Sequence, residues 1–224
     1  MTGVCLLVVA KAPVAGLAKT RLAATLGDDR AAAIAAAALL DTLDAVERTP
    51  AACRVVAMTG NLDDAHSADE IRSRLEAFVV LPQRGDDFAD RLANAHVDAA
   101  AACGGLPVVQ IGMDTPQVSP ALLSRCADAL DVHDAALGMA HDGGWWVLGV
   151  RDATWADCLR DVPMSVPDTG SLTLDALRTN GLRVGLVDEL TDVDTVDDID
   201  EVRRACAPES RFRDVTASVR VQEA

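Results

Sequence analysis

Short runs of β-branched and aliphatic residues alternate with helix-like stretches along most of this chain, and this alternation limits the fold more than any other feature. Strands joined through helices run parallel, with helices on both faces of the sheet. The pattern therefore predicts an α/β protein with a largely parallel sheet. The predicted strands cover 4–10, 53–59, 77–82, 107–113, 134–140, 145–150 and 182–188. The predicted helices lie near 28–48, 63–75, 86–103, 119–130, 171–179 and 195–206.

The composition fits one domain with a core of small aliphatic side chains. Half of the 224 residues are hydrophobic but only 3% are aromatic, so Ala, Val and Leu must fill most of the core. A chain of this length can bury one α/β core and is short for two. We predict a single domain over residues 1–207, followed by a loosely ordered, mixed and polar tail over residues 208–224.

The charge, the hydropathy and the cysteine spacing exclude several classes of protein. A formal net charge of −15 repels nucleic acid and anionic membranes, so neither is an expected partner. The apolar run at 4–10 is too short to span a bilayer and lacks the layout of a signal peptide. The six cysteines have no metal-binding spacing, which predicts reduced, buried thiols in a cytoplasmic protein and neither a disulfide frame nor a zinc site. These are Cys5, Cys53, Cys103, Cys126, Cys158 and Cys206.

Four polar motifs follow predicted strands. In open sheets of this kind, ligands bind beyond the carboxyl ends of the strands. The shared location of the motifs therefore predicts a single ligand site. The motifs are "KAPVAGLAKTRL" after the first strand, "QRGDD" after the third, "MDTP" after the fourth, and "HDGGWW" between the fifth and the sixth.

The first motif contains the only two lysines of the chain, Lys11 and Lys19, against eighteen arginines. Gly16 permits a left-handed backbone, and Lys19 and Arg21 fall at the expected start of a helix, where backbone N–H groups favour anions. We interpret the motif as a phosphate-binding loop, although it has neither the Walker A nor the dinucleotide-binding glycine spacing. The alternative is that both lysines are solvated surface charges.

Asp114 directly follows the fourth predicted strand and faces the same crevice as the lysine motif. A carboxylate in this position can hold a divalent cation that bridges phosphate oxygens. The alternative is a turn-forming Asp, but Ser119 and Pro120 already supply the cap and the first residue of the next helix. We therefore predict metal or phosphate chemistry for Asp114.

Two later segments add acidic groups to the predicted site. In "HDGGWW" the paired glycines indicate either a tight connection or a close approach of a ligand to the backbone, and Asp142 is a candidate for contact with a substrate or metal. His141 is more typical of a surface imidazole than of a catalytic base. In "DVDTVDDIDEV", most of the acids fit the solvated start of an acidic helix, with Asp194 or Thr195 as its N-cap. The alternative for Asp194 is a second metal ligand opposite Asp114.

As an ordered set, these motifs resemble the GT-A, or nucleotide-diphospho-sugar transferase, superfamily. The resemblance covers about residues 4–206 and is closest to a widespread bacterial family of GT-A-like proteins, some of them named glycosyltransferases. Phospholactate guanylyltransferases and molybdenum-cofactor nucleotidyltransferases are related to that family. The motifs that carry the resemblance are "KAPVAGLAKTRL", "QRGDDFADRL", "IGMDTP", "DGGWWVLG" and "DVDTVDDIDEV".

The resemblance implies a three-layer GT-A fold with a role for each motif. It implies that Mg²⁺ or Mn²⁺ is bound by Asp114 and Asp194, and that Lys19, Arg21 and Asp114 act in catalysis. The implied nucleotide-binding residues are Lys11, Gly16, Lys19, Arg21, Gln83 and Gly85. The residues implied to face the acceptor or sugar are Asp142, Gly143 and Gly144.

The expected activity is transfer from a nucleotide or nucleotide-sugar donor to a small-molecule acceptor, with glycosyl transfer favoured by the resemblance. The first alternative is nucleotidyl transfer, in which an acceptor phosphate attacks the α-phosphate and pyrophosphate leaves. The second is a non-catalytic nucleotide-binding module, which would bind nucleotide without a divalent metal and form no product.

Overall fold

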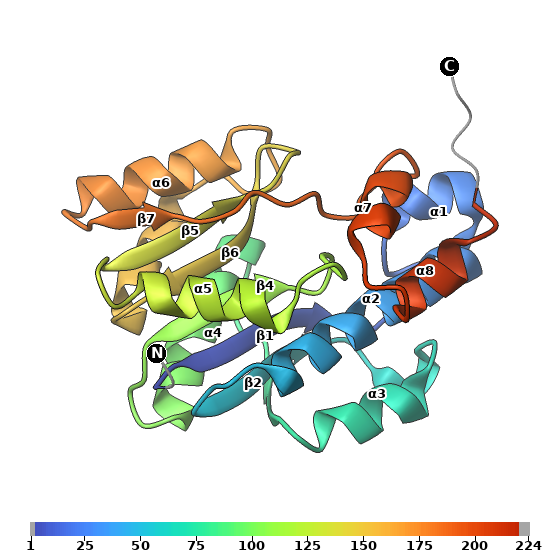
Figure 1. The fold of residues 1–224 in the computed structure, drawn as a ribbon, viewed down its shortest axis with the longest axis horizontal. Coiled ribbons are helices and arrows are strands. Elements are labelled where there is room, and N and C mark those ends of the chain that lie inside the picture. Colours follow the sequence, from blue (N-terminus) through green and yellow to red (C-terminus); the bar gives the residue numbers. More distant parts are fainter. Residues whose placement is uncertain (1–2, 220–224) are drawn as a thin grey trace.

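The computed structural model describes residues 3–219, which fold into a sheet between two layers of helices (Figure 1). In this part of the chain the sheet has seven strands in the order β3-β2-β1-β4-β6-β5-β7, and only β6 runs antiparallel to its neighbours. The predicted α/β fold with a largely parallel sheet is confirmed. The strands are β1 (Cys5–Lys11), β2 (Cys53–Thr59), β3 (Val79–Pro82), β4 (Val108–Gly112), β5 (Ala135–Met139), β6 (Trp145–Val150) and β7 (Val184–Leu186).

Helices cover both faces of the sheet, each over its own hydrophobic core. They are α1 (Thr20–Leu26), α2 (Asp28–Arg48), the 3-10 helix η1 (Leu62–Asp64), α3 (Ala68–Leu75), α4 (Phe88–Ala102), α5 (Pro120–Ala129), the 3-10 helix η2 (Ala153–Asp161), α6 (Thr169–Thr179), α7 (Ile199–Ala205) and α8 (Arg211–Thr216). One face is covered by α2, α3 and α5, and the other by α4, α6 and η2. A third cluster joins α1 and α2 to α7 and α8 at one end of the molecule.

The sequence of α2 explains both its helical form and its position. Ala has the highest helix propensity, and the segment is rich in Ala. Asp28 and Asp29 in the first turn and Arg48 in the last turn complement the helix dipole. Because Ala side chains are small, the buried face of α2 can lie close to the sheet. Neither α2 nor any other helix within residues 3–219 combines the length and the apolar character that a bilayer crossing requires.

The position of β1 in the middle of the sheet creates a crevice at one edge. β1 pairs in parallel with β2 on one side and with β4 on the other. The connection after β1 leads towards β2, and the connection after β4 leads in the opposite direction along the sheet, towards β5. A crevice therefore opens at the carboxyl ends of these two strands. Lys11 ends β1, and Asp114 lies just after the end of β4.

The tail that we predicted to be loosely ordered is packed against the domain as far as residue 219. Residues 211–216 form α8, which packs against α2, and Phe212 is fully buried. Arg211 forms ion pairs with three carboxylates, those of Asp41, Asp44 and Glu70. A buried aromatic ring and an ion-pair network therefore hold a segment whose composition is mostly polar. The rest of the predicted tail, residues 220–224, lies outside the described residues.

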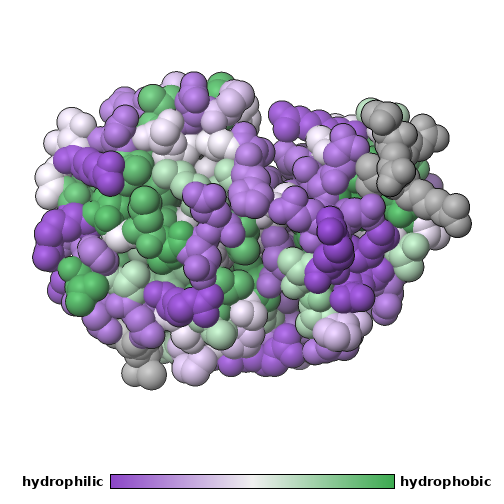
Figure 2. Space-filling view, turned by 45° about the horizontal axis from the view of Figure 1, so that its top comes forward, coloured by the Kyte–Doolittle hydropathy of each residue, from purple (hydrophilic) through white to green (hydrophobic). Residues whose placement is uncertain are grey.

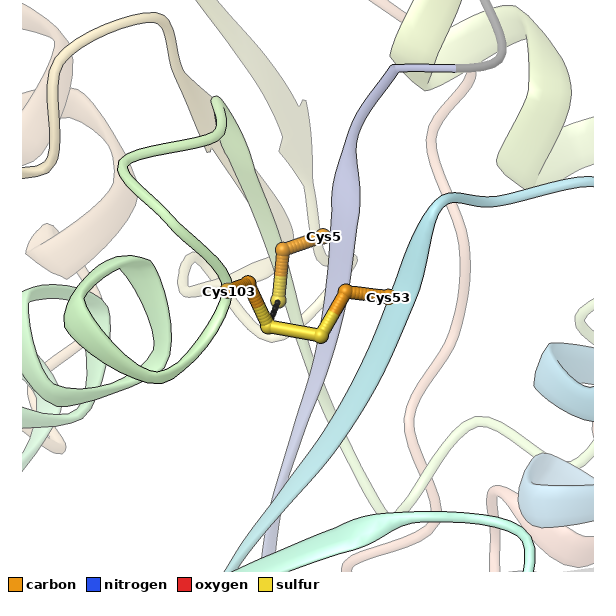
Figure 3. Close-up of side chains that lie close together, drawn as sticks. All are labelled: Cys5, Cys53 and Cys103. Atoms are coloured by element: carbon orange, nitrogen blue, oxygen red, sulfur yellow. Dashed lines mark hydrogen bonds between the residues drawn. A yellow bond between two sulfur atoms is a disulfide. The ribbon is translucent and has the colours of Figure 1, made fainter.

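The prediction that the cysteines are all reduced thiols is wrong for two of them. Cys53 at the start of β2 and Cys103 after α4 form a disulfide, with Cα atoms 6.0 Å apart (Figure 3). α4 returns to the amino ends of the strands, which brings Cys103 to Cys53 across 50 residues of sequence. So long a separation leaves no spacing pattern to recognise. Cys5, Cys126 and Cys206 are buried thiols, and burial raises the pKa of Cys5 to about 12.

Candidate active site

A cleft of about 760 Å³ opens at the carboxyl ends of β1 and β4. Its walls come from segments far apart in the sequence, including the start of α4 and the loops at 142–145, 164–167 and 192–194. The space-filling view shows the surface notched between the part that holds α6 and the part that holds α1 and α7, with hydrophilic residues around the notch (Figure 2). The four predicted motifs all contribute residues to this cleft.

Lys19 is held in place by its backbone conformation and by two acids. It lies at the N-terminal end of α1 with φ 50° and ψ 53°, a left-handed conformation that is rare outside glycine. Its ammonium lies 2.9 Å from Asp114 Oδ2 and 2.8 Å from Asp194 Oδ1, and the side chain is only 10% exposed. Burial alone would lower the pKa of Lys19, but the two carboxylates outweigh burial and raise the pKa. Lys19 is therefore a buried, fully charged cation.

Asp194 does not cap the helix that follows it, so that interpretation is wrong. The helix predicted at 195–206 begins only at Ile199, with Asp198 at the N-cap position. Asp198 Oδ2 accepts hydrogen bonds from the backbone N–H groups of Asp194 and Thr195, at 3.0 and 2.6 Å. The Asp194 side chain thus takes no part in capping and points to the cleft, whose lining it joins.

Three cations surround the Asp194 side of the cleft. Arg21 lies 3.0 Å from Asp194 Oδ2, although its side chain is 64% exposed. Burial would raise the pKa of Asp194, but Lys19 and Arg21 outweigh burial and lower it. Lys11 lines the same cleft from the end of β1 and is exposed. The predicted cations of the first motif are therefore together in one place.

Three carboxylates gather beside Lys19. Oxygen atoms of Asp142, Asp192 and Asp194 lie within 4.8 Å of one another. Burial, together with repulsion from Asp142 and Asp194, raises the pKa of Asp192 to about 6. Grouped carboxylate oxygens are the donors that hard divalent cations prefer. This acidic cluster (Asp142, Asp192 and Asp194) offers more oxygen ligands than Asp114 and Asp194 alone, both of which already contact the Lys19 ammonium.

The two predicted glycines of the nucleotide site shape loops and do not line the cleft, whereas Gln83 does line it. Nε2 of Gln83 donates hydrogen bonds to one carbonyl of β1 and one of β2, at 2.8 and 2.9 Å, which fixes its amide at the ends of both strands. At Gly85 a Cβ would lie 2.7 Å from Cβ of Asp90, so glycine lets this loop lie against α4. Gly16 has φ 76°, as its predicted left-handed conformation requires.

The loop between β5 and β6 forms one wall of the cleft. Asp142 Oδ1 accepts a hydrogen bond from the N–H of Gly144 at 2.8 Å, and both residues line the cleft. Gly143 has φ 90°, and a Cβ there would lie 1.7 Å from the carbonyl oxygen of Pro167. Gly143 therefore allows a neighbouring loop to approach and is not itself part of the lining. Trp145 is half-buried and adds an aromatic surface to the wall.

Several polar residues that line the cleft were not predicted from the sequence, among them Asp192, Arg91 and Gln110. Asp192 was interpreted only as part of a solvated acidic segment. Arg91 lies on α4 and donates a hydrogen bond from Nε to the carbonyl of Asp87. Gln110 is 1% exposed, and its Oε1 has no hydrogen-bond partner among residues 3–219. A polar residue inside the apolar strand "PVVQIGM" is the signal that could have identified it. The Nδ1 atom of His141 shares a hydrogen bond with the hydroxyl of Thr191, and His141 does not line the cleft.

Solved structures confirm the predicted nucleotide-diphospho-sugar transferase fold. A Desulfovibrio desulfuricans G20 protein, provisionally named a nucleotide-diphospho-sugar transferase, is 26% identical with a TM-score of 0.84, over 97% of this chain and 95% of that chain. A nucleotidyl transferase from Methanothermobacter thermautotroptrophicus is 19% identical with a TM-score of 0.54, over 90% and 96%. Rv0371c from Mycobacterium tuberculosis H37Rv, in complex with manganese, is 22% identical with a TM-score of 0.53, over 88% and 97%.

Protein-family comparison gives a second, independent result. No curated protein matches the sequence. One family model matches residues 42–166, more than half of the chain, from α2 to the loop before α6. The matched region contains the "MDTP" and "HDGGWW" motifs and thus Asp114 and Asp142. The chain belongs to the family described as "Uncharacterized protein conserved in bacteria (DUF2064)".

Proposed function

We propose that this protein is a metal-dependent transferase that uses a nucleotide-activated donor. The observation that carries the proposal is the meeting of Lys19 with Asp114 and Asp194 at the ends of β1 and β4. Lys11 and Arg21 add two cations to the same cleft, in a protein with a formal net charge of −15. A local concentration of cations in an acidic protein favours a polyanionic ligand such as a nucleoside diphosphate group.

The acids of the cleft fit a divalent cation. Asp142, Asp192 and Asp194 present hard oxygen donors within 4.8 Å of one another, which suits Mg²⁺ or Mn²⁺. We propose that Asp114 and Asp194 hold the cation, as the resemblance implies, and that Asp192 and Asp142 extend this ligand set. When bound, the cation would neutralise negative charge on the donor phosphates. The manganese complex of Rv0371c, which has a similar fold, supports this part of the proposal.

Lys19 is preorganised for its proposed role. Its left-handed backbone costs about 1–3 kcal/mol, and two ion pairs to Asp114 and Asp194 hold the side chain in place before any ligand binds. A fixed charge directed at developing negative charge stabilises a transition state without reorganisation. We propose that Lys19 and Arg21 bind the leaving phosphates and that Lys11 binds the donor at the end of β1.

The opposite wall of the cleft would bind the acceptor or the sugar. It presents the carboxylate of Asp142, the backbone at Gly144 and the ring of Trp145. Gly143 would contribute indirectly, because it lets the loop at Pro167 close against this wall. The unpartnered Oε1 of Gln110 offers a hydrogen-bond acceptor at the floor.

We favour glycosyl transfer, because the 26%-identical structure carries a sugar-transferase name. Nucleotidyl transfer is the second candidate, because a nucleotidyl transferase shares the fold. The products separate the two reactions. Incubation with labelled sugar nucleotides and nucleoside triphosphates in Mg²⁺ should release nucleoside diphosphate in the first case and pyrophosphate in the second.

The Asp114→Asn variant tests the site itself. Loss of one such charged contact removes about 2.7 to 4 kcal/mol of transition-state stabilisation, so turnover should fall about a hundred- to a thousandfold. Asp98→Asn is the matched control, because Asp98 pairs with Arg84 and neither residue lines the cleft. Undiminished turnover in Asp114→Asn would remove Asp114 from the mechanism.

Nucleotide titration with and without Mg²⁺ tests whether the protein is an enzyme at all. A metal-dependent transferase should bind nucleotide more tightly with the ion, since phosphates and carboxylates then share it. If the nucleotide affinity in a chelator equals that in Mg²⁺, and no donor yields product, the results would favour a non-catalytic nucleotide-binding module.

A further inference from the structure

Three cysteines meet at the amino edge of the sheet, opposite the cleft. Cys5 and Cys53 are direct neighbours in the parallel register of β1 and β2, and Cys103 follows α4 (Figure 3). Cys103 Sγ lies 3.6 Å from Cys5 Sγ, in addition to its bond to Cys53. All three sulfur atoms lie within 4.8 Å of one another. We call these residues the cysteine cluster.

The spacing of these sulfurs suits a metal ion once the disulfide is reduced. Zinc–thiolate bonds of about 2.3 Å place two sulfurs on one ion about 3.8 Å apart, close to the 3.6 Å between Cys103 and Cys5. Thiolates select soft or borderline ions such as Zn²⁺ over Mg²⁺. The cysteine cluster and the acidic cluster of the cleft therefore differ in the ions that they can bind.

One side of the cysteine cluster is accessible. Cys5 is buried, but Cys53 and Cys103 are only half-buried. The turn after Cys103 has open space around it, because a Cβ added at Gly104 or Gly105 would meet nothing within 4 Å. An ion can therefore enter from this side, and water can supply the fourth ligand of a tetrahedral site.

We propose that the reduced chain binds one Zn²⁺ through Cys5, Cys53 and Cys103, and that the disulfide is the oxidised, metal-free form of this site. A dithiol reductant passes two electrons and two protons to the Cys53–Cys103 bond and is itself oxidised to a disulfide. Three thiols result, and they release three protons when their sulfurs bind the ion. In both forms the end of α4 stays linked to the sheet, through sulfur–sulfur or sulfur–zinc bonds. This proposal does not depend on the proposed transferase activity.

Cobalt titration of the full-length chain tests the site, because sulfur-to-cobalt charge transfer absorbs in the near ultraviolet and oxygen ligands give no such absorption. After reduction with a phosphine, we expect one equivalent of Co²⁺ to produce this absorption and Zn²⁺ to remove it. The oxidised chain should show none, because the disulfide leaves Cys5 as the one thiol of the cluster.

Variants assign the ligands. Cys53→Ser and Cys103→Ser, each compared with the reduced wild type, should weaken Co²⁺ binding more than about tenfold. Both positions are half-buried, so these variants keep the core around Cys5 intact. Cys158→Ser is the matched control, because it removes a half-buried thiol elsewhere. The proposal is overturned if the reduced chain gives no charge-transfer absorption, if the absorption survives both cluster variants, or if it is equally strong before reduction.

Discussion

The two edges of the central sheet are held together by different forces. At the carboxyl edge, Lys19 meets Asp114 and Asp194 through charge, beside a cleft. At the amino edge, the cysteine cluster lies against the apolar core that α4 shares with the sheet. A charged ligand can replace ion pairs with contacts of its own, whereas it leaves a disulfide unchanged. The fold thus keeps its exchangeable contacts where ligands enter and its covalent link at the opposite edge.

Reduction of the disulfide removes a link at the amino edge alone. We expect it to change the free energy of unfolding more than the other changes do. The bond joins residues that are 50 apart in the sequence. In the chain-entropy model, a disulfide that closes a loop of this length adds about 4 kcal/mol to the free energy of unfolding. Urea unfolding in a chelator, with and without reductant, measures this difference. The Cys53→Ser, Cys103→Ser double variant should match the reduced protein, and nucleotide affinity should not change. Equal unfolding midpoints for the oxidised and reduced chains would contradict the comparison.

The Lys19→Met substitution removes the central cation of the carboxyl edge. Turnover should fall about a hundred- to a thousandfold, equivalent to about 2.7 to 4 kcal/mol, because the fixed charge at the leaving group is lost. The free energy of unfolding should fall by more than about 1 kcal/mol, since Asp114 and Asp194 lose a buried partner. Steady-state product release and urea unfolding measure the two effects. Arg183→Gln is the control, because it removes an ion pair with Asp134 outside the cleft. An equal loss of turnover there would show that Lys19 has no special position.

Most of the fold could be predicted because it follows from local patterns. β2 and β6 have the bounds that their apolar runs indicate, and Ser119 caps α5 with Pro120 as its first residue. α8 and the disulfide could not be predicted, because both depend on contacts between distant segments. Phe212 is buried against α2 only once the chain has returned across the sheet, and no local pattern reports that return.

Less of the candidate site could be predicted, for a different reason. The rule that ligands bind at the carboxyl ends of parallel strands brings the motifs of Lys19 and Asp114 together, and the resemblance adds Asp194 to them. The structure has the Lys19 ammonium in contact with both acids. Their roles remain predictions. The rule does not specify side-chain directions, so it did not show that Lys19 lies between two acids, or that Asp192 is half-buried beside them.

Asp192→Asn should change stability in a pH-dependent way and so sharpens the view of the carboxyl edge. The folded chain raises the pKa of Asp192 from 3.8 to about 6. Between these values the folded state keeps a proton that the unfolded state has lost, so rising pH destabilises the wild type until about pH 6. At pH 8 without metal, the variant should be more stable by roughly 2 kcal/mol, after allowance for solvent screening.

Urea unfolding of both proteins at a series of pH values measures this effect. Below about pH 3 the wild type and Asp192→Asn should have the same stability, because the group is then protonated in both states. Mg²⁺ should stabilise the wild type more than the variant at pH 8, since it neutralises the crowded carboxylates. A stability difference that is constant across the pH range would contradict the raised pKa.

Arg21→Gln should have the smallest effect on the free energy of unfolding. It tests whether burial determines how much an ion pair at the carboxyl edge stabilises the protein. Arg21 and Lys19 bind the same carboxylate of Asp194, at 3.0 and 2.8 Å, but their side chains are 64% and 10% exposed. Exposed ion pairs contribute about 0.2–1 kcal/mol, so the free energy of unfolding should fall by less than about 1 kcal/mol. Added salt should remove most of that difference in urea unfolding. If Arg21→Gln destabilised the protein more than Lys19→Met, the exposed ion pair would contribute more to stability than the buried one. Burial would then not explain the stability of the carboxyl edge.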